Sequence, residues 1–246
     1  MTQRTTRVFD TMQELCSAVA TDIQDVIATD VTARGECHIV LTGGTVGIAL
    51  LRDIDPSNDA IDWTHVHVWW GDERFVESDS ADRNDGQATK ALLGRIRIPA
   101  ENVHRMPARE DGLSLDEAAR SYAAELSEFF GADFPRFDLV LLGVGPDAHV
   151  ASLFPGLPGI SVSGQTVIAV RDSPKPPPER ISLSLPSINS SRRVWVVASG
   201  DDKAEAIHLA TTSRDPNVAP VSAVGGSEET CLYVDASAAS KSKEFD

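Results

Sequence analysis

The sequence is poor in cysteine and contains no long hydrophobic run. Its three cysteines, Cys16, Cys37 and Cys231, are far apart among 246 residues and form no Cys-x-x-Cys pair. This spacing excludes a cysteine zinc knuckle, gives no disulfide framework and is typical of a reducing compartment. No stretch of about 18 apolar residues occurs, and the N-terminus lacks the apolar centre of a signal peptide. We therefore expect a soluble, cytoplasmic protein with no membrane segment.

Basic residues are also scarce. Lys and Arg total 22 against 37 Asp and Glu, which gives a formal net charge of −15. A surface with this charge repels nucleic acid and anionic membranes, so we expect neither as a partner. A phosphorylated ligand would need a locally basic pocket. The length suits one large α/β domain, and we expect residues 1–246 to form a single domain, as a monomer or a weak homodimer.

Short apolar segments alternate with segments of helical periodicity. Buried strands are predicted at 37–41, 61–70, 139–142, 165–170, 180–185, 194–198 and 230–234. Helices are predicted at 12–28, 46–51, 87–93 and 204–209, after Ser114, and from 236 to a frayed end. This alternation predicts an α/β fold with a doubly wound, mostly parallel, Rossmann-like sheet flanked by helices. The four prolines within 174–178 predict a stiff, extended loop beside the site.

The segment 137–156 is the strongest candidate for chemistry. An apolar strand is followed by Gly143 and Gly145, and then by Asp147 and His149, which suggests a strand, a sharp turn and a helix start. Polar groups at the carboxyl end of a parallel strand lie where such sheets bind ligands. Imidazole is well suited to accept a proton near neutral pH, so His149 is a candidate general base. The alternative is a histidine that only caps a loop.

Two other segments carry weaker signals. The residues Thr42-Gly43-Gly44-Thr45 lead from a strand into a helix, where unpaired N–H groups attract phosphate, although they could form only a tight turn. Asp72-Glu73-Arg74 lies at the carboxyl end of another strand, where Arg74 could form a bidentate contact with phosphate or a sugar oxygen pair. The alternative is a surface ion pair among the three residues. His65 and His67 would share a strand face, but no third metal ligand is nearby, so we expect a partly exposed strand face and no metal. We also expect no organic cofactor.

Four ordered motifs resemble one family. Gly-x-Gly-Pro-Asp-x-His-x-Ala-Ser-Leu-Phe-Pro-Gly at 143–156 is similar to the signature of the 6-phosphogluconolactonases, which share a fold with glucosamine-6-phosphate deaminases and isomerases. The segments 42–45, 70–76 and 180–189 match in the same order. The resemblance implies hydrolysis of 6-phospho-D-glucono-1,5-lactone to 6-phospho-D-gluconate, a step of the oxidative pentose phosphate pathway. The implied partner is thus a small sugar-phosphate lactone.

The resemblance also implies roles for individual residues. His149 would activate water, oriented by Asp147 or by Asp72, and N–H groups of the Gly145–Ser152 turn and helix start would stabilise the oxyanion. Substrate-binding roles are implied for Gly43, Gly44, Thr45, Asp72, Arg74, Arg180 and Lys203. Asn84 is a further candidate to face the ligand.

The sequence departs from the family pattern at two places. Ala148 replaces the usual glycine, and Val46-Gly47 replaces the usual Thr-Pro, so the resemblance is not extended to Val46. One alternative is a deaminase or isomerase on the same fold, but those enzymes continue their histidine motif with Ile-Ala-Phe-Asn-Glu-Pro rather than the residues found at 150–155. A second alternative is a non-catalytic sugar-phosphate sensor, although no basic helix-turn-helix precedes the first helix.

Overall fold

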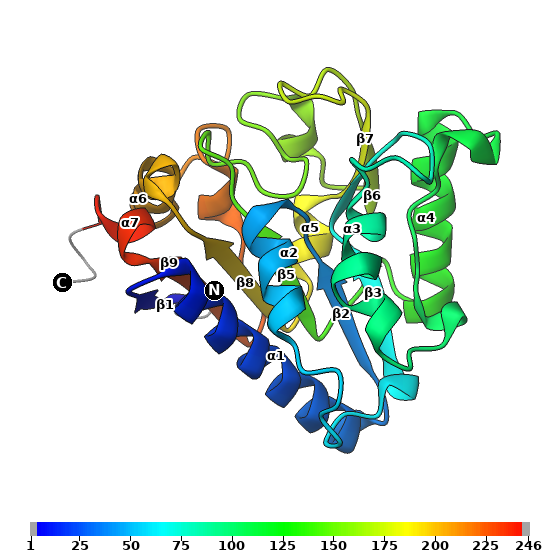
Figure 1. Ribbon diagram of the computed structural model, residues 1–246. Helices are drawn as coiled ribbons and strands as arrows, with labels where there is room; N and C mark the ends of the chain where they lie inside the picture. Colours follow the sequence, from blue (N-terminus) through cyan, green and yellow to red (C-terminus); the bar gives the residue numbers. More distant parts are fainter. Residues whose placement is uncertain (1–3, 243–246) are drawn as a thin grey trace.

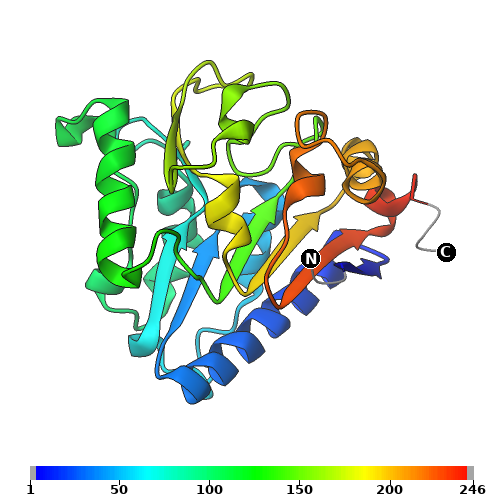
Figure 2. The ribbon, with the colours of Figure 1, turned by 180° about the vertical axis from the view of Figure 1, so that it is seen from behind.

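The computed structural model describes residues 4–242 and is built around a six-stranded sheet (Figure 1). The strand order is β1 (Arg4–Phe9), β9 (Glu229–Asp235), β8 (Arg193–Ala198), β5 (Leu139–Gly143), β2 (Cys37–Leu41) and β3 (Val66–Trp70). All neighbouring strands are parallel. Helices α1 (Met12–Arg34) and α2 (Gly44–Asp53) lie in front of the sheet in Figure 1, whereas α5 (Leu185–Asn189) covers the opposite face in Figure 2. The predicted doubly wound, mostly parallel fold is therefore confirmed.

The central strands owe their position to apolar sequence on both faces. All five residues of β2 are buried, and so are Leu139–Leu142 of β5. Strands covered on both faces by helices require this continuous hydrophobicity rather than alternation. Within residues 4–242, no helix combines the length and the apolar character needed to cross a lipid bilayer.

Local capping residues fix the ends of the two long helices. Helix α1 begins where the Thr11 hydroxyl accepts the N–H of Glu14, and ends at Gly35, whose φ is +86°. Helix α4 (Leu115–Phe130) begins at the predicted capping box of Ser114 with Glu117. The remaining helices are α3 (Asn84–Ala91), α6 (Ala204–Thr212) and α7 (Ala236–Ala239). The predicted frayed end beyond α7 reaches into residues 243–246, which lie outside the described part of the chain.

Several predicted boundaries were wrong. The helix predicted at 12–28 continues to Arg34, and the strand predicted from 61 begins only at Val66, because Trp63–His65 form a 3₁₀ turn. The helix predicted at 46–51 already begins at Gly44. Strand β1 was not predicted. A second, antiparallel sheet, in the order β4 (Asp72–Arg74), β7 (Arg180–Leu183) and β6 (Val167–Val170), was also missed.

No helix begins after Gly145, contrary to the prediction. Val150 instead forms an antiparallel bridge back to Val144, and the N–H of Gly145 donates to the carbonyl of His149 at 2.9 Å. The chain then continues through turns to a 3₁₀ helix at Pro158–Ser161. His149 is therefore held by a closed loop, and no helix dipole contributes there.

The winding of the main sheet reverses between β2 and β5. From β2 the chain passes to β3 on one side, whereas from β5 it passes to β8 and β9 on the other. The helical connections diverge at such a point and leave a crevice at the carboxyl ends of the two strands. The Thr42 hydroxyl spans this crevice by accepting the N–H of Gly143 at 3.1 Å. The motifs that follow β2 and β5 are thus brought to one place.

Candidate active site

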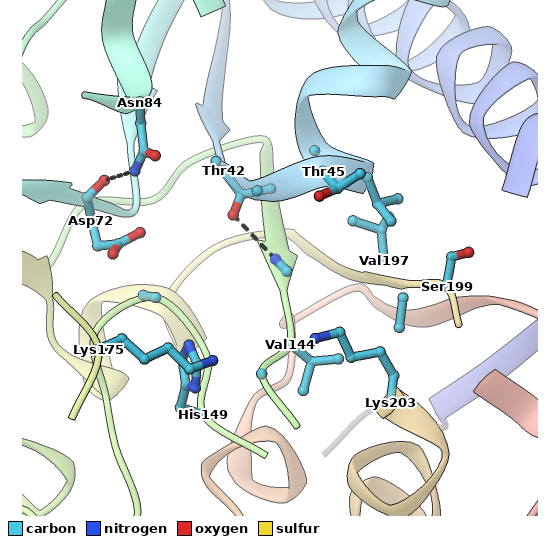
Figure 3. Close-up of a pocket in the computed structure, with 18 of the residues that line it drawn as sticks. Thr42, Thr45, Asp72, Asn84, Val144, His149, Lys175, Val197, Ser199 and Lys203 are labelled. Atoms are coloured by element: carbon cyan, nitrogen blue, oxygen red, sulfur yellow. Dashed lines mark hydrogen bonds between the residues drawn. The ribbon is translucent and has the colours of Figure 1, made fainter. Parts of the chain in front are cut away.

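A cavity of about 480 Å³ opens at this crevice (Figure 3). It brings together every predicted site residue except Asp147, which touches the cavity only through His149. Its lining includes the predicted residues Gly43, Gly44, Thr45, Asp72, Arg74, His149, Arg180 and Lys203, and also Asn84, Lys175, Ser199 and Asp202. Segments from β2, β4, β5, β7 and β8 thus contribute to one pocket.

Asp147 is the carboxylate that contacts the candidate base. Its Oδ1 lies 2.5 Å from His149 Nδ1. Because an ionised carboxylate can only accept, Nδ1 carries the proton and Nε2 is left as the basic nitrogen. The other candidate, Asp72, instead accepts the Ser152 hydroxyl at 2.7 Å and lies 3.8 Å from Arg180 Nη1.

The surroundings of Asp147 favour its charged form. Partial burial by itself raises the pKa of this carboxyl. The hydrogen bond and charge of His149 and the charge of Lys175 lower the pKa by more than burial raises it, so the net shift is downward. The His149 side chain is 13% exposed, and its ring packs on Phe154 with a centroid distance of 4.5 Å. The imidazole therefore has a defined orientation and remains accessible from the cavity.

Two residues of the turn have unusual backbone requirements. A Cβ at Gly145 would lie 2.0 Å from Nδ1 of His149, so only glycine allows the His149–Asp147 pair at this spacing. Ala148 occupies the left-handed region with φ at +64° and is fully buried. This conformation costs a residue with a Cβ about 1–2 kcal/mol relative to right-handed backbone. The turn therefore keeps its left-handed geometry although alanine replaces the glycine usual in the family.

One end of the cavity is suited to an anion. Helix α2 begins at Gly44 with Gly43 as its N-cap, which has no side chain to occupy the first N–H groups. Lys203 lines the same cavity, where Figure 3 shows its side chain extending toward Val144, and its Nζ lies 2.9 Å from Asp202. Unpaired N–H groups at a helix start and an adjacent ammonium are the groups that bind phosphate in proteins.

The wall that adjoins Gly43 is organised by Glu73. This buried carboxylate accepts the N–H groups of Arg74, Asn84 and Asp85 at 2.8–2.9 Å. The Asn84 side chain in turn accepts from Arg74 Nη1 at 2.6 Å and donates to the carbonyl of Asp72 at 2.8 Å. The Nε–H of Arg74 has no acceptor among residues 4–242. Beside the cavity, this buried donor is therefore left unsatisfied by the described part of the chain.

Arg180 enters the site from the start of β7, and Lys175 enters it from the proline loop that precedes this strand. Arg180 is 4% exposed, and it donates to the carbonyls of Lys175 at 3.0 Å and Pro177 at 3.2 Å. Burial lowers the pKa of Arg180, and Asp72 opposes this effect. Lys175 was missed as a site residue. Its only sequence signal was its position within the loop predicted to lie beside the site.

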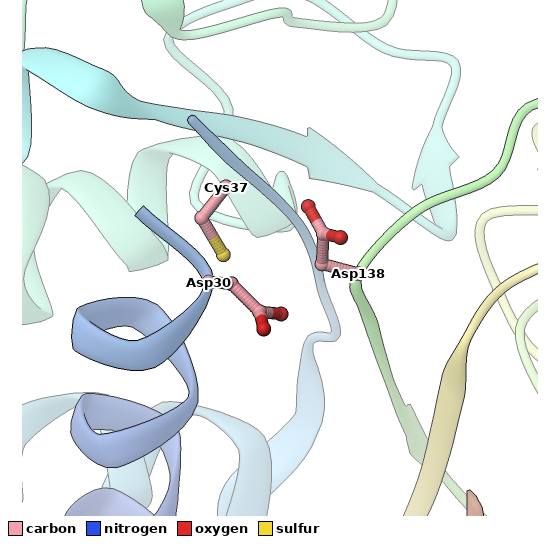
Figure 4. Close-up of side chains that lie close together, drawn as sticks. All are labelled: Asp30, Cys37 and Asp138. Atoms are coloured by element: carbon pink, nitrogen blue, oxygen red, sulfur yellow. The ribbon is translucent and has the colours of Figure 1, made fainter. Parts of the chain in front are cut away.

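One group of side chains outside the cavity has spacing suitable for a metal ion, but its carboxylates are already paired with arginines. Asp30, Cys37 and Asp138 are the one described group with suitable spacing (Figure 4). Arg193 lies 2.7 Å from Asp30, and Arg34 lies 2.9 Å from Asp138. These carboxylates therefore form a buried ion-pair network away from the cavity.

The two strand histidines do not share a face. His65 lies in the 3₁₀ turn, 3.2 Å from Asp62, whereas His67 on β3 hydrogen-bonds to His104 at 3.0 Å. The face-sharing expected from a strand over 61–70 was wrong, because the strand begins only after His65.

The fold is shared with several solved structures. The "devB protein" has a TM-score of 0.86 at 28% identity, and the match covers 98% of this chain and 100% of that one. A 6-phosphogluconolactonase from Thermotoga maritima has a TM-score of 0.83 at 25% identity, covering 95% and 100% of the two chains.

Sequence relatives match over almost the full length. A 6-phosphogluconolactonase from Mycobacterium tuberculosis is 43% identical over 238 residues, covering 95% of this chain and 96% of the relative. One from Streptomyces coelicolor is 42% identical over 235 residues, covering 92% and 90%. The family model for glucosamine-6-phosphate isomerases/6-phosphogluconolactonase matches residues 10–233. The chain therefore belongs to the glucosamine-6-phosphate isomerase/6-phosphogluconolactonase family.

Proposed function

We propose that the protein hydrolyses 6-phospho-D-glucono-1,5-lactone to 6-phospho-D-gluconate. The observation that carries this proposal is the His149–Asp147 pair, which presents a basic nitrogen to a cavity lined by four cations. An anionic ester with an activated carbonyl suits such a site. The relatives at 42–43% identity carry the name of this activity.

His149 acts as the general base of the proposed reaction. As a water oxygen forms its bond to the lactone carbonyl carbon, the water proton passes to Nε2, and the carbonyl electron pair moves onto oxygen. Asp147 holds the ring through Nδ1 and stabilises the imidazolium. When the carbonyl re-forms, the ring C–O bond breaks, and the departing oxygen takes the proton from His149. A positioned base of this kind contributes about 10²–10⁴ in rate.

The phosphate is held at the end of the cavity formed by the start of α2 and Lys203. The N–H groups that follow Gly43 and the Thr45 side chain provide donors, and Lys203 provides charge. Arg74 and Arg180 add positive charge from the second sheet, where they lie opposite each other in the β4–β7 register. This local field offsets the negative charge of the rest of the chain.

The test is turnover of lactone generated in place from glucose 6-phosphate, corrected for spontaneous opening. We expect catalysed acid release by the wild-type chain, and a loss of about 10²–10⁴ in kcat for His149→Asn with an unchanged melting temperature. His208→Asn, a histidine of α6 outside the cavity, is the matched control. Ammonia release from glucosamine 6-phosphate, or sugar-phosphate binding without lactone turnover, would overturn the proposal.

A further inference from the structure

Three backbone donors of the turn that carries His149 are already engaged within the protein. The N–H of Gly145 donates to the carbonyl of His149, and that of Ala148 to the carbonyl of Gly145, both at 2.9 Å. The N–H of Ser152 donates to the Ser182 hydroxyl at 3.2 Å. These donors hold the turn closed. Negative charge that develops beside His149 cannot draw on these three donors, and a nearby cation would stabilise it.

Lys175 is the cation placed beside this pair. Figure 3 shows its side chain lying along His149, and its Nζ is 3.9 Å from Asp147 Oδ1. Among residues 4–242, no other lysine or arginine has a nitrogen within 4.0 Å of Asp147. Lys203, at the start of α6, lines the same cavity, and Figure 3 shows its side chain extending toward Val144.

The main chain of Lys175 is fixed independently of its side chain. The Ser173 hydroxyl donates to the carbonyl of Lys175 at 2.8 Å and accepts its N–H at 3.2 Å. Arg180 Nη2 donates to the same carbonyl at 3.0 Å. Pro174 and Pro176 restrict the backbone on either side. The loop therefore fixes the point from which the Lys175 side chain leaves the main chain, and the loop would keep this conformation if the side chain lost its charge.

The ammonium of Lys175 is incompletely compensated. Burial lowers its pKa, Asp147 opposes this effect, and the nearby charges of Lys203 and Arg180 lower it further. A cation in such surroundings gains interaction energy when a new negative charge forms within reach. Preorganised charges of this kind stabilise a transition state without reorganisation at the moment of reaction.

We propose that Lys175 is a catalytic residue that binds the lactone carbonyl oxygen and stabilises the oxyanion formed when water adds. This proposal rests on the lactonase function proposed above. The carbonyl electron pair moves onto the oxygen that faces Lys175 Nζ while the water proton passes to His149. Lys175 remains an ammonium throughout, and ring opening returns the electron pair to the carbonyl. Lys203 binds the phosphate in the proposed function and makes no direct contact with the oxyanion in this step.

The test compares Lys175→Met with Lys203→Met by turnover and by calorimetric binding of two ligands. 6-Phosphogluconate has a carboxylate where the oxyanion forms, whereas glucitol 6-phosphate has a hydroxymethyl group there and the same phosphate. We expect Lys175→Met to lower kcat about 10²–10³-fold. This substitution should weaken the binding of 6-phosphogluconate at least about tenfold and change the affinity for glucitol 6-phosphate less than about twofold. Lys203→Met should weaken the binding of both ligands by the same factor.

Two results would overturn the role of Lys175 while leaving the proposed function intact. One is a wild-type-like kcat in Lys175→Met, and the other is an equal loss of affinity for the two ligands, which would make it a phosphate ligand. A lowered kcat with unchanged affinity for both ligands would indicate action only through Asp147 and would also refute direct contact. Absence of lactone turnover by the wild-type chain would instead refute the proposed function and this role with it.

Discussion

Replacing Gly145 with alanine tests the site by adding a single methyl group. The added Cβ would lie 2.0 Å from both Nδ1 and Cε1 of His149, and 2.4 Å from Oδ1 of Asp147. Real Cβ atoms do not tolerate such contacts, so the imidazole must leave its carboxylate. Gly145 does not have a positive φ, and alanine can therefore adopt its backbone conformation. The substitution is thus aimed at the His149–Asp147 pair rather than at the fold.

The expected loss follows from what the pair supplies. Removing a positioned general base costs about 10²–10⁴ in kcat, which corresponds to about 2.7–5.4 kcal/mol of barrier. The cost to folding should be smaller, about 1–3 kcal/mol for a locally overpacked site, because the 13% exposed His149 ring can turn into the cavity. Activity should therefore fall far more than stability.

The assay is acid release from lactone formed in place, together with urea unfolding of the same preparation. Gly71→Ala is the matched control, since it adds the same methyl at the same edge of the sheet, where the nearest atom is 3.6 Å away. We expect this control to retain kcat within about threefold, as ordinary contact distances require little adjustment. A folded Gly145→Ala protein with near wild-type kcat would refute the geometric account of His149.

Two further predictions concern buried titratable groups. Glu73→Gln replaces an oxygen that accepts N–H groups with a donor, so urea unfolding should show a loss of about 1–3 kcal/mol, and kcat/KM should fall as Arg74 and Asn84 shift. Burial raises the pKa of Glu73 from 4.5 to about 7, so its contribution to stability is complete below pH 4.5 and is lost as pH rises through 7; the Gln variant should lack this slope. The contribution of His67 to stability depends on pH in the opposite direction. Burial lowers the pKa of His67 from 6.5 to about 4, so the stability that is present above pH 6.5 is lost as pH falls toward 4. His67→Asn should reduce that slope by up to about 1.4 kcal/mol per pH unit, the value for one proton, and unchanged slopes in both variants would contradict the two assignments.

Most of the main sheet could be predicted from the sequence, because its central strands are short apolar runs between turn residues. Parallel strands place their carboxyl ends at one edge, so the motifs after 37–41 and 139–142 could be expected to meet. The structure brings them together, with the Thr42 hydroxyl joined to the N–H of Gly143. Local pattern sufficed here because each motif directly follows a strand.

The features that were missed depend on contacts between distant segments. Strand β1 is an edge strand with alternating burial and no apolar run, and only pairing with β9 defines it. The loop after Gly145 closes through Val144 and Val150, which local propensity does not reveal. The choice of Asp147 over Asp72 depends on side-chain geometry, and the position of Lys175 depends on a loop held by Arg180. Tertiary hydrogen bonds, rather than sequence periodicity, determine these parts of the site.

The charge that lines the pocket is opposite in sign to the net charge of the whole chain. The chain carries a net charge of −15, yet the described cavity is lined by four cations and by two carboxylates, Asp72 and Asp202. Asp72 is occupied by the Ser152 hydroxyl and faces Arg180, so it adds little free negative charge to the cavity. A cleft of one sign with low-dielectric walls concentrates the field on a ligand of the opposite sign. The acidic surface thus repels polyanions in general, while an anion small enough to enter the cavity meets a positive field.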